Sequence, residues 1–268
     1  MTTDLFGTRS ILFLPASNSR ATAKARESDA DLVVLDLEDA VKPDDKNAAR
    51  AAAADAVMSD WPMPVAIRIN GVGSEWHLLD IEAVAGSKCD YAVLPRTASV
   101  HDVRQVRDAI GKPVMAMIET AAGVLASASI ADAASALIAG TNDLRTDLRL
   151  PLDATRDPIS VSLQLIILAA RSAGIAAFDG VYNRLADRDG FIAECMHGRG
   201  LGFDGKSLIH PDQIGPCNEA FSPSEEEIES ARQLVDAFSG GAERFKDRMI
   251  ERMHVEAARR VLDRAGLA

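Results

Sequence analysis

The stretch VMAMIETAAGVLASASIADAASALIAGTND, residues 114–143, contains two apolar runs of strand length, and each is followed closely by a carboxylate. Glu119 directly follows the run 114–118, and Asp143 comes three residues after the run 136–140. Small or turn-forming residues surround both carboxylates, which is typical of the carboxyl end of a strand in a parallel sheet. We therefore expect both side chains at the same edge of one sheet.

Two carboxylates at such an edge, with few other protein ligands nearby, suit a hard and partly hydrated Mg²⁺ that keeps coordination positions open for substrate. Either carboxylate alone could equally cap a helix or be solvated. Their joint placement favours a metal site, so we predict that Glu119 and Asp143 bind Mg²⁺. Asp147, four residues after Asp143, is better interpreted as a loop cap than as a second ligand.

Apolar runs rich in Val, Ile and Leu recur along the chain with helix-forming segments between them, for example 46–58 and 100–110. Such alternation predicts a parallel α/β sheet with right-handed crossovers. Eight runs are typical of a (β/α)8 TIM barrel. A doubly wound open sheet is the alternative, but it favours a glycine-rich loop after the first strand, and FLPASNS (13–19) has no glycine. The eight runs are 10–15, 32–37, 65–70, 91–95, 114–118, 136–140, 175–178 and 206–211.

Polar residues occupy the predicted strand ends, where a barrel enzyme places its catalytic groups. Arg68 could hold a carboxylate or stabilise an enolate, or it could form a structural salt bridge with Glu38. Glu38 and Asp39 could bind metal-bound water or orient Arg68, so we count both as supporting residues. His210 could contact a ligand, although a hydrogen-bonded loop histidine is the simpler interpretation. The polar residues at these ends are Glu38, Asp39, Arg68, Asn70, Arg96, Glu119, Asp143, Asp179 and His210.

Two basic sites could meet phosphate. Arg20 and Lys24 are four residues apart, so they share one face if their segment is helical. Lys206 lies in GFDGKSLIHP (202–211), where two glycines allow close approach of the backbone to a ligand. Together these sites suggest an extended phosphorylated ligand across the mouth of the barrel.

The bulk properties exclude several classes of protein. A net charge of −11 over 268 residues repels nucleic acid and anionic membranes. No apolar stretch reaches the roughly 18 residues needed to span a bilayer, and MTTDLFGTRS (1–10) shows no secretory signal. The three cysteines are widely spaced, which predicts neither a disulfide framework nor a zinc site. We therefore expect a cytoplasmic protein.

The chain continues beyond the last predicted strand. We expect a barrel over residues 1–222 and a helical extension over 223–268 that packs on the barrel or on a neighbouring subunit. Two helical segments are predicted in the extension, residues 222–238 and 247–265, with Gly240 and Gly241 between them. The first opens with Ser224 and Glu227, which have the spacing of a capping box.

Six motifs occur in an order that resembles the citrate lyase β-subunit-like proteins of the HpcH/HpaI aldolase superfamily, with its malyl-CoA and citramalyl-CoA lyases. The resemblance covers about residues 9–265. It implies a TIM barrel, trimeric or a dimer of trimers, that cleaves or forms a carbon–carbon bond next to a CoA thioester with Mg²⁺. The motifs are RSILFLPASNSRATAKA (9–25), DLVVLDLEDAV (31–41), AIRING (66–71), MIETAAGV (117–124), GTNDL (140–144) and GFDGKSLIHPDQI (202–214).

The resemblance also implies roles for individual residues. Glu119 and Asp143 become metal ligands, and Arg68 faces the carbonyl and carboxylate of the substrate. Arg20, Lys24 and the segment from Lys206 to His210 approach CoA. In lyases of this group a tail aspartate from a neighbouring subunit can serve as the acid or base, and Asp247 is the nearest match in this chain.

The sequence departs from the family pattern at two loops. Ala16 stands where the family usually has glycine, and Asn142 stands where an acidic residue is common. Our leading expectation is a Mg²⁺-dependent lyase acting on a short 3-hydroxyacyl-CoA such as malyl-CoA or citramalyl-CoA, with a 2-oxo acid as product or co-substrate. The alternatives are an acyl-CoA thioesterase on the same scaffold, or a non-catalytic, carrier-dependent subunit of citrate lyase β type.

Overall fold

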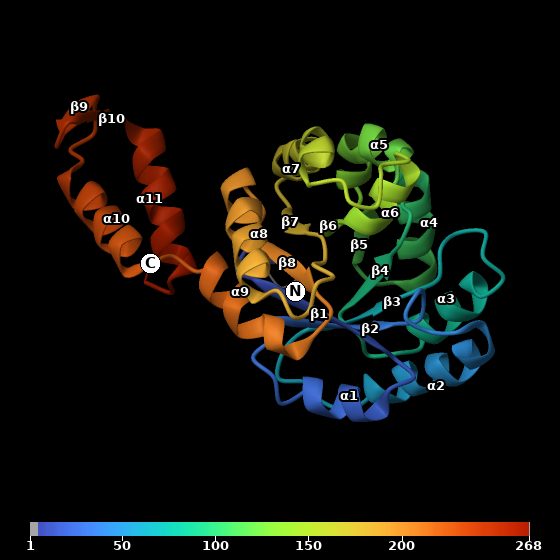
Figure 1. Cartoon of the computed structure of the whole chain (residues 1–268). Helices are drawn as coiled ribbons and strands as arrows, with labels where there is room; N and C mark the ends of the chain where they lie inside the picture. The colour runs from blue at the N-terminus through green and yellow to red at the C-terminus, as the bar shows by residue number, and fades with distance from the viewer. Residues whose placement is uncertain (1–4, 268) are drawn as a thin grey trace. The chain divides into compact units, whose positions relative to one another are not determined.

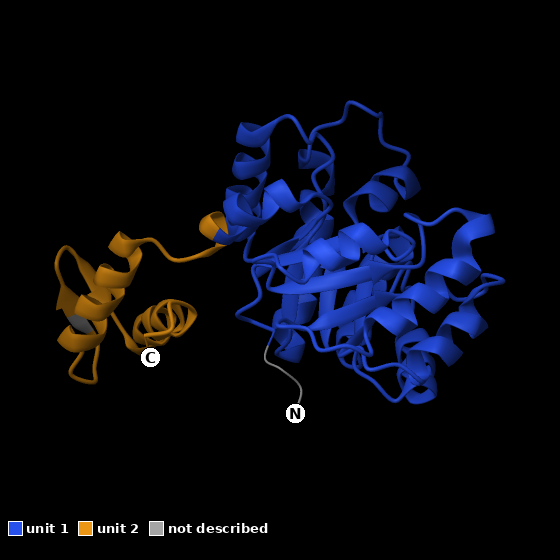
Figure 2. Ribbon diagram, turned by 90° about the horizontal axis from the view of Figure 1, so that it is seen from below, with its two compact units in different colours: residues 1–218 blue, residues 219–268 orange. Residues whose placement is uncertain are grey.

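The computed structural model describes residues 5–267, which form two compact units (Figure 2). Unit 1 ends at Asn218 and unit 2 begins at Glu219. This division falls inside helix α9 (Ile214–Phe221), four residues before the boundary we set at 222. Each unit is described below by itself.

Unit 1 is a closed barrel of eight parallel strands in which each strand pairs with the next and β8 pairs with β1 (Figure 1). The predicted (β/α)8 TIM barrel is therefore confirmed. All eight apolar runs form strands, although the run 206–211 ends as a strand at Leu208. The strands are β1 (Ser10–Pro15), β2 (Leu32–Asp36), β3 (Val65–Arg68), β4 (Tyr91–Leu94), β5 (Val114–Ile118), β6 (Ala136–Ala139), β7 (Ala176–Asp179) and β8 (Gly205–Leu208).

Helices connect the strands and cover the outside of the barrel (Figure 1). Helix α4 shows why such segments fold locally, since the Ser99 side chain caps its start and Gly111 ends it in the left-handed conformation. The connecting helices are α1 (Ser19–Ala25), α2 (Lys46–Ala56), α3 (His77–Ala85), α4 (Val100–Ile110), α5 (Ala121–Ala131), α6 (Thr141–Asp147), α7 (Ser160–Ala173) and α8 (Arg188–Leu201), and short 3-10 turns occur at Pro43–Asp45, Asp157–Ile159 and Pro211–Gln213.

Alternate residues of each strand point into the barrel, and the residues between them pack under the helices. The interior cluster includes Ile11, Val34, Met115 and Phe178, all with no exposed surface. Both faces of the strands are buried, so the strands read as continuous apolar runs. The same alternation decides which polar residues near the carboxyl ends of the strands point into the barrel.

Unit 2 consists of two helices with a hairpin between them. Helix α10 (Glu225–Ala237) has the predicted capping box, in which the Ser224 and Glu227 side chains each accept a backbone N–H. The second helix begins later than we predicted, because residues 248–250 form strand β10 (Arg248–Ile250), which pairs with β9 (Glu243–Phe245). Helix α11 (Arg252–Arg264) follows the hairpin.

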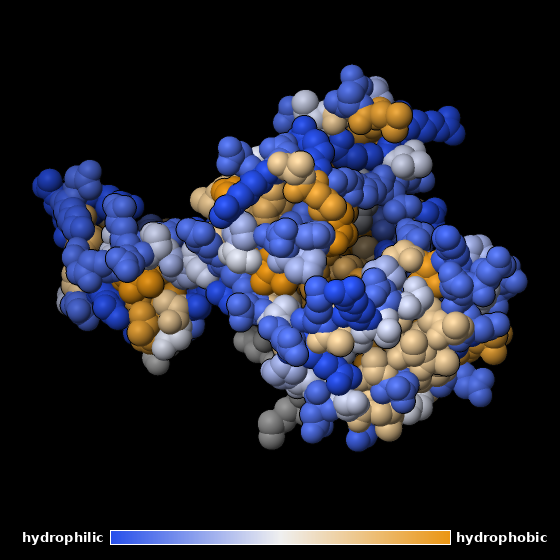
Figure 3. All heavy atoms as spheres, turned by 60° about the horizontal axis from the view of Figure 1, so that its bottom comes forward, coloured by the Kyte–Doolittle hydropathy of each residue, from blue (hydrophilic) through white to orange (hydrophobic). Residues whose placement is uncertain are grey.

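Hydrophilic residues cover much of the surface seen in Figure 3, with apolar residues gathered in patches. Helix α7 contributes exposed apolar side chains at Val161, Leu165 and Leu168, whose spacing places them on one helix face. Among the described residues, none of the helices is both long and apolar enough to cross a membrane.

Candidate functional site

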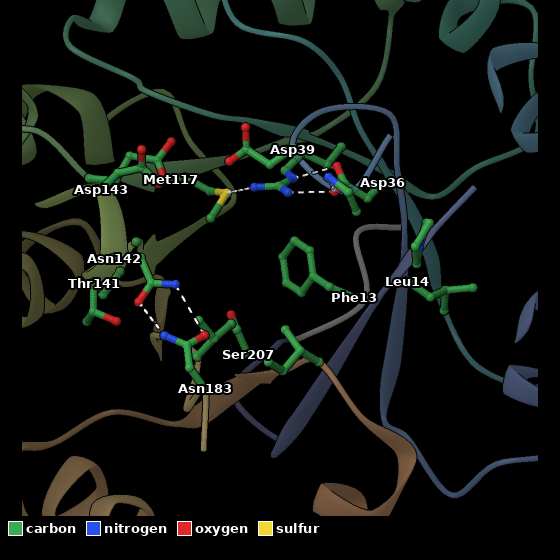
Figure 4. A pocket seen from close by; sticks show the side chains of 18 residues that line it. Phe13, Leu14, Asp36, Asp39, Met117, Thr141, Asn142, Asp143, Asn183 and Ser207 are labelled. Carbon is green, nitrogen blue, oxygen red and sulfur yellow. Dashed lines mark hydrogen bonds and ion pairs between the residues drawn. The ribbon is translucent and has the colours of Figure 1, made fainter. Parts of the chain in front are cut away.

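A cavity of about 400 Å³ opens at the carboxyl end of the barrel strands, within unit 1 (Figure 4). Four carboxylates and one guanidinium line it, together with an apolar wall that includes Phe13 and Met117. The charged lining residues are Asp36, Asp39, Arg68, Glu119 and Asp143.

Glu119 follows β5 directly and its residue is 2% exposed. The backbone N–H of Arg96, a residue in the left-handed region at φ 48°, donates to Glu119 Oε1 at 2.5 Å. Gly140 packs against the other side, where any side chain would collide with the carboxylate. Burial raises the pKa of Glu119 to about 7, and the nearby carboxylate of Asp143 adds to this shift.

Asp143 lies in the first turn of α6, directly after β6, and its side chain is 37% exposed. Its Oδ1 lies 3.3 Å from Arg96 Nη1, so Arg96 contacts Glu119 through its backbone and Asp143 through its side chain. The structure thus brings both predicted metal ligands to one wall of the same cavity.

Arg68 lies at the end of β3, points into the barrel and is 9% exposed. Its guanidinium forms a bidentate pair with Asp36, with Nε–Oδ1 at 2.7 Å and Nη2–Oδ2 at 2.6 Å. Its Nη1 lies 2.9 Å from Glu38 Oε2. The structure therefore contains the salt bridge to Glu38 that we considered and adds Asp36, which we did not select. Arg68 also lines the cavity, so a substrate contact is compatible with this pairing.

Glu38 and Asp39 lie on the loop after β2, and Asp39 lines the cavity. A buried lysine holds this loop, since Lys46 Nζ donates to the carbonyl oxygens of Leu37 at 2.6 Å and Glu38 at 2.8 Å. Burial raises the pKa of Glu38 to about 8, although the Arg68 guanidinium acts in the opposite direction.

The site has an excess of carboxylates. Five of them, at positions 36, 38, 39, 119 and 143, surround the guanidiniums of Arg68 and Arg96. A hard divalent cation with oxygen ligands fits this set and would relieve the repulsion between Glu119 and Asp143. The described residues include no cluster of three or more His, Cys, Asp or Glu arranged to hold a metal. Two protein ligands would therefore leave most coordination positions to water and substrate.

Lys206 does not have the position we predicted for a phosphate ligand. Its side chain is fully buried outside the barrel, with Nζ 3.0 Å from Asp179 and 2.7 Å from Glu194. Arg156 completes the network, with Nη2 contacting Asp179 at 2.5 Å. Burial alone would lower the pKa of Lys206, but the two carboxylates outweigh it and raise the pKa. Because this network is closed, Lys206 has no access to a CoA phosphate, and Asp179 does not belong to the rim.

The remaining predicted residues lie on the surface of unit 1. Arg20 and Lys24 are exposed on α1, where the helical spacing we assumed is present. His210 caps a short 3-10 turn, with its Nδ1 accepting from the Asp212 N–H at 3.2 Å, which agrees with a hydrogen-bonded loop histidine. Asp147 accepts the Ala121 N–H at 2.6 Å and thus caps the start of α5, as expected.

Asp247 is an exposed residue in the turn between β9 and β10 of unit 2. Its role as an acid or base therefore stays a prediction. Sequence reasoning also missed three polar residues of the cavity wall, Asn142, Asn183 and Ser207. Strand alternation places Ser207 and Lys206 on opposite sides of β8, but the sequence gives no signal for which of the two faces the cavity.

An acidic cavity with a buried arginine at the carboxyl edge of a closed (β/α)8 barrel is typical of the active sites of barrel enzymes. Within that class, residues 9–211 match the HpcH/HpaI aldolase/citrate lyase family. The chain belongs to this family, which confirms the family predicted from the motifs and that the protein is an enzyme of the citrate lyase β-subunit type.

Several characterised proteins are similar to the chain over nearly its whole length. A (3S)-malyl-CoA thioesterase of Cereibacter sphaeroides is 41% identical, over 96% of this chain and 94% of the relative. The citrate lyase subunit beta of Escherichia coli is 32% identical, over 97% and 94%. Protein CitE of Mycobacterium tuberculosis, in a crystal structure with magnesium, acetoacetate and coenzyme A, is 33% identical, with a TM-score of 0.87 over 97% of this chain and 98% of that one.

Proposed function

We propose that the protein is a Mg²⁺-dependent enzyme that acts on a short 3-hydroxyacyl-CoA with a free carboxylate, such as malyl-CoA. The observation that supports this most directly is that Glu119, Asp143 and Arg68 line one cavity of about 400 Å³. The neighbour solved with magnesium and coenzyme A and the malyl-CoA thioesterase relatives point to the same ligands.

The residues have separate roles in this proposal. Glu119 and Asp143 would hold the metal, which when bound would act as a Lewis acid toward a substrate oxygen. Arg68, fixed by Asp36, would face the free carboxylate or a developing oxyanion of the substrate. Asp39 would orient water or substrate at the open side of the cavity.

Hydrolysis of the thioester is the reaction we place first. The relatives at 38–41% identity are (3S)-malyl-CoA thioesterases, whereas the citrate lyase β relatives are 32–33% identical. This order reverses our expectation from the sequence, in which cleavage of the carbon–carbon bond came first. Lyase activity stays the second candidate, because the family match and the CitE structure with acetoacetate and coenzyme A support it.

Product analysis of the purified protein with malyl-CoA and Mg²⁺ separates the candidates. Malate plus free CoA indicates hydrolysis, and glyoxylate plus acetyl-CoA indicates lyase activity. If neither forms at any Mg²⁺ concentration, the proposed activity is wrong and a carrier-dependent subunit is favoured.

CoA would approach along α1, where Arg20 and Lys24 are exposed. His210 also stays a candidate for contact with CoA, although its ring already caps a turn. We further propose a homo-oligomer, a trimer or hexamer, in which Asp247 of one subunit could reach the cavity of another.

Mixing two inactive variants tests the shared site. Asp247→Ala subunits combined with Glu119→Ala subunits should recover part of the activity, because a mixed contact would contain one complete site. Subunit exchange is verified by native mass spectrometry, and exchange without any recovered activity would exclude Asp247 as a shared group.

A further inference from the structure

Ser207 is a buried hydroxyl that faces the cavity. In β8 it pairs with Ile11, an interior residue of β1, and like Ile11 it points into the barrel, whereas Lys206 points outward to Glu194. The residue is 1% exposed, and Oγ has no hydrogen-bond partner among residues 5–267. Buried hydroxyl groups are normally hydrogen-bonded, so an unpaired one in a cavity wall indicates a ligand partner.

Two asparagine side chains lie beside Ser207 on the same wall (Figure 4). Asn183 Nδ2 donates to Asn142 Oδ1 at 2.7 Å, and Asn142 Nδ2 donates to Asn183 Oδ1 at 3.3 Å. Each amide has two N–H donors, and this pair uses one from each. One N–H on each asparagine is therefore available to a ligand.

The cavity is asymmetric in charge. Among its described lining residues, Arg68 is the single cation, and it pairs with Asp36. Asp36, Asp39 and Asp143 lie across the cavity from the wall of Ser207 and Asn183 (Figure 4). That wall has hydrogen-bond donors but no charge. In the proposed function, Arg68 faces the substrate's free carboxylate or a developing oxyanion, and the metal ligands serve another substrate oxygen. The uncharged wall suits a polar group without charge.

We propose that Ser207 and the Asn142–Asn183 pair bind the thioester carbonyl of the substrate, with Ser207 Oγ–H and a free amide N–H donating to the carbonyl oxygen. This inference rests on the proposed function, because it assigns the acyl-CoA carbonyl to that site. The wall thereby favours acyl groups whose thioester carbonyl reaches it when their free carboxylate lies near Arg68. It is a specificity-determining element for either hydrolysis or carbon–carbon cleavage.

Binding of two stable analogues tests the assignment without turnover. One is the malyl ketone of dethia-carba-CoA, in which CH₂ replaces sulfur and the carbonyl is kept. The other is S-(3-carboxy-3-hydroxypropyl)-CoA, a thioether that lacks the carbonyl. Calorimetry in Mg²⁺ should show that the wild type binds the ketone about fivefold more tightly than the thioether, as expected for hydrogen bonds to one carbonyl. Mass spectrometry verifies that the ketone is intact.

Ser207→Ala should reduce this preference to below about twofold while leaving thioether binding unchanged. Ser135→Ala is the matched control, because Ser135 Oγ is also buried without a partner but lies outside this cavity. It should keep the full preference. If circular dichroism shows that Ser207→Ala does not fold, Asn183→Ala replaces it, because Asn183 is exposed. The preference for the ketone over the thioether should then fall by about two- to threefold.

The outcomes separate the two proposals. An unchanged preference in Ser207→Ala, or in Asn183→Ala if that variant has to decide, overturns the inference and leaves the proposed function intact. If the wild type binds the ketone better than CoA but no better than the thioether, the inference is likewise overturned and the proposed function is left intact. A wild type that binds the ketone no better than CoA overturns both.

Discussion

Two clusters of charged side chains occupy the ends of the barrel strands, and they differ in direction and in balance. The cavity cluster lies in and around the cavity and combines five carboxylates with two guanidiniums, those of Arg68 and Arg96. The outer cluster lies between the barrel and its helices and pairs Arg156 and Lys206 with Asp179 and Glu194. Only the first has charge left for a ligand.

The comparison shows that a polar residue at a strand end is not sufficient to indicate function. Asp179 and Glu119 both end apolar strands, yet one is neutralised by two cations and the other has a raised pKa beside a second carboxylate. Direction relative to the barrel separates them, since the interior side leads to the cavity and the exterior side is closed by a helix. The two clusters should therefore respond in opposite ways to substitution.

The largest effect is expected in the cavity cluster. Glu119→Ala and Asp143→Ala should each lower Mg²⁺-dependent turnover of malyl-CoA by about a thousandfold or more, which is roughly 4 kcal/mol of barrier. Neither should lower the melting temperature of the metal-free protein, because each removes one of two repelling carboxylates. Steady-state kinetics and calorimetry measure both quantities. Near-normal turnover at saturating Mg²⁺ would show that the residue is not a ligand.

The outer cluster should show the reverse. Lys206→Met leaves Asp179 and Glu194 with only Arg156, so we expect a loss of about 3–5 kcal/mol in the free energy of unfolding. Urea denaturation measures this loss. Lys24→Met, which changes an exposed lysine on α1, is the control and should stay within about 0.5 kcal/mol. A loss in Lys206→Met as small as the control's would contradict the closed network.

Arg68→Lys sharpens the comparison, because it keeps the charge but removes the planar fork that contacts Asp36 and Glu38. We expect kcat/KM to fall at least tenfold, or about 1.4 kcal/mol. A smaller loss in kinetics, together with a lowered melting temperature, would indicate that Arg68 serves only as a structural ion pair.

The stability of the cavity cluster should also depend on pH. The pKa of Glu38 is raised from 4.5 to about 8 in the folded protein, so folding favours its protonated form. The stability from this group is fully present below about pH 4.5 and is lost as pH rises through about 8. Glu38→Gln mimics the protonated form, so its stability should stay constant between pH 5 and 9 while that of the wild type falls. Urea denaturation at both pH values measures the difference, and a parallel pH dependence in both proteins would show that Glu38 is ionised throughout.

Much of the barrel could be predicted because its information is local. Apolar runs of strand length, separated by helix-forming segments, determine a closed parallel sheet with little help from distant residues. The same locality placed Glu119 and Asp143 at the carboxyl edge, since each lies within four residues of the end of its own strand. The capping box at Ser224 and Glu227 was equally readable, because all its partners lie within three residues.

Other features depended on the tertiary structure. Lys206 and Ser207 are adjacent in a strand buried on both faces, so apolar alternation gives no sign of which one faces the cavity, and only the register with β1 decides it. The pairing of Arg68 with Asp36 joins residues 32 positions apart. The hairpin at β9 and β10 replaced a predicted helical turn because strand pairing satisfied its backbone instead. The sequence by itself determined which residues end the strands, and only the fold decided which of them met a cavity and which met an opposite charge.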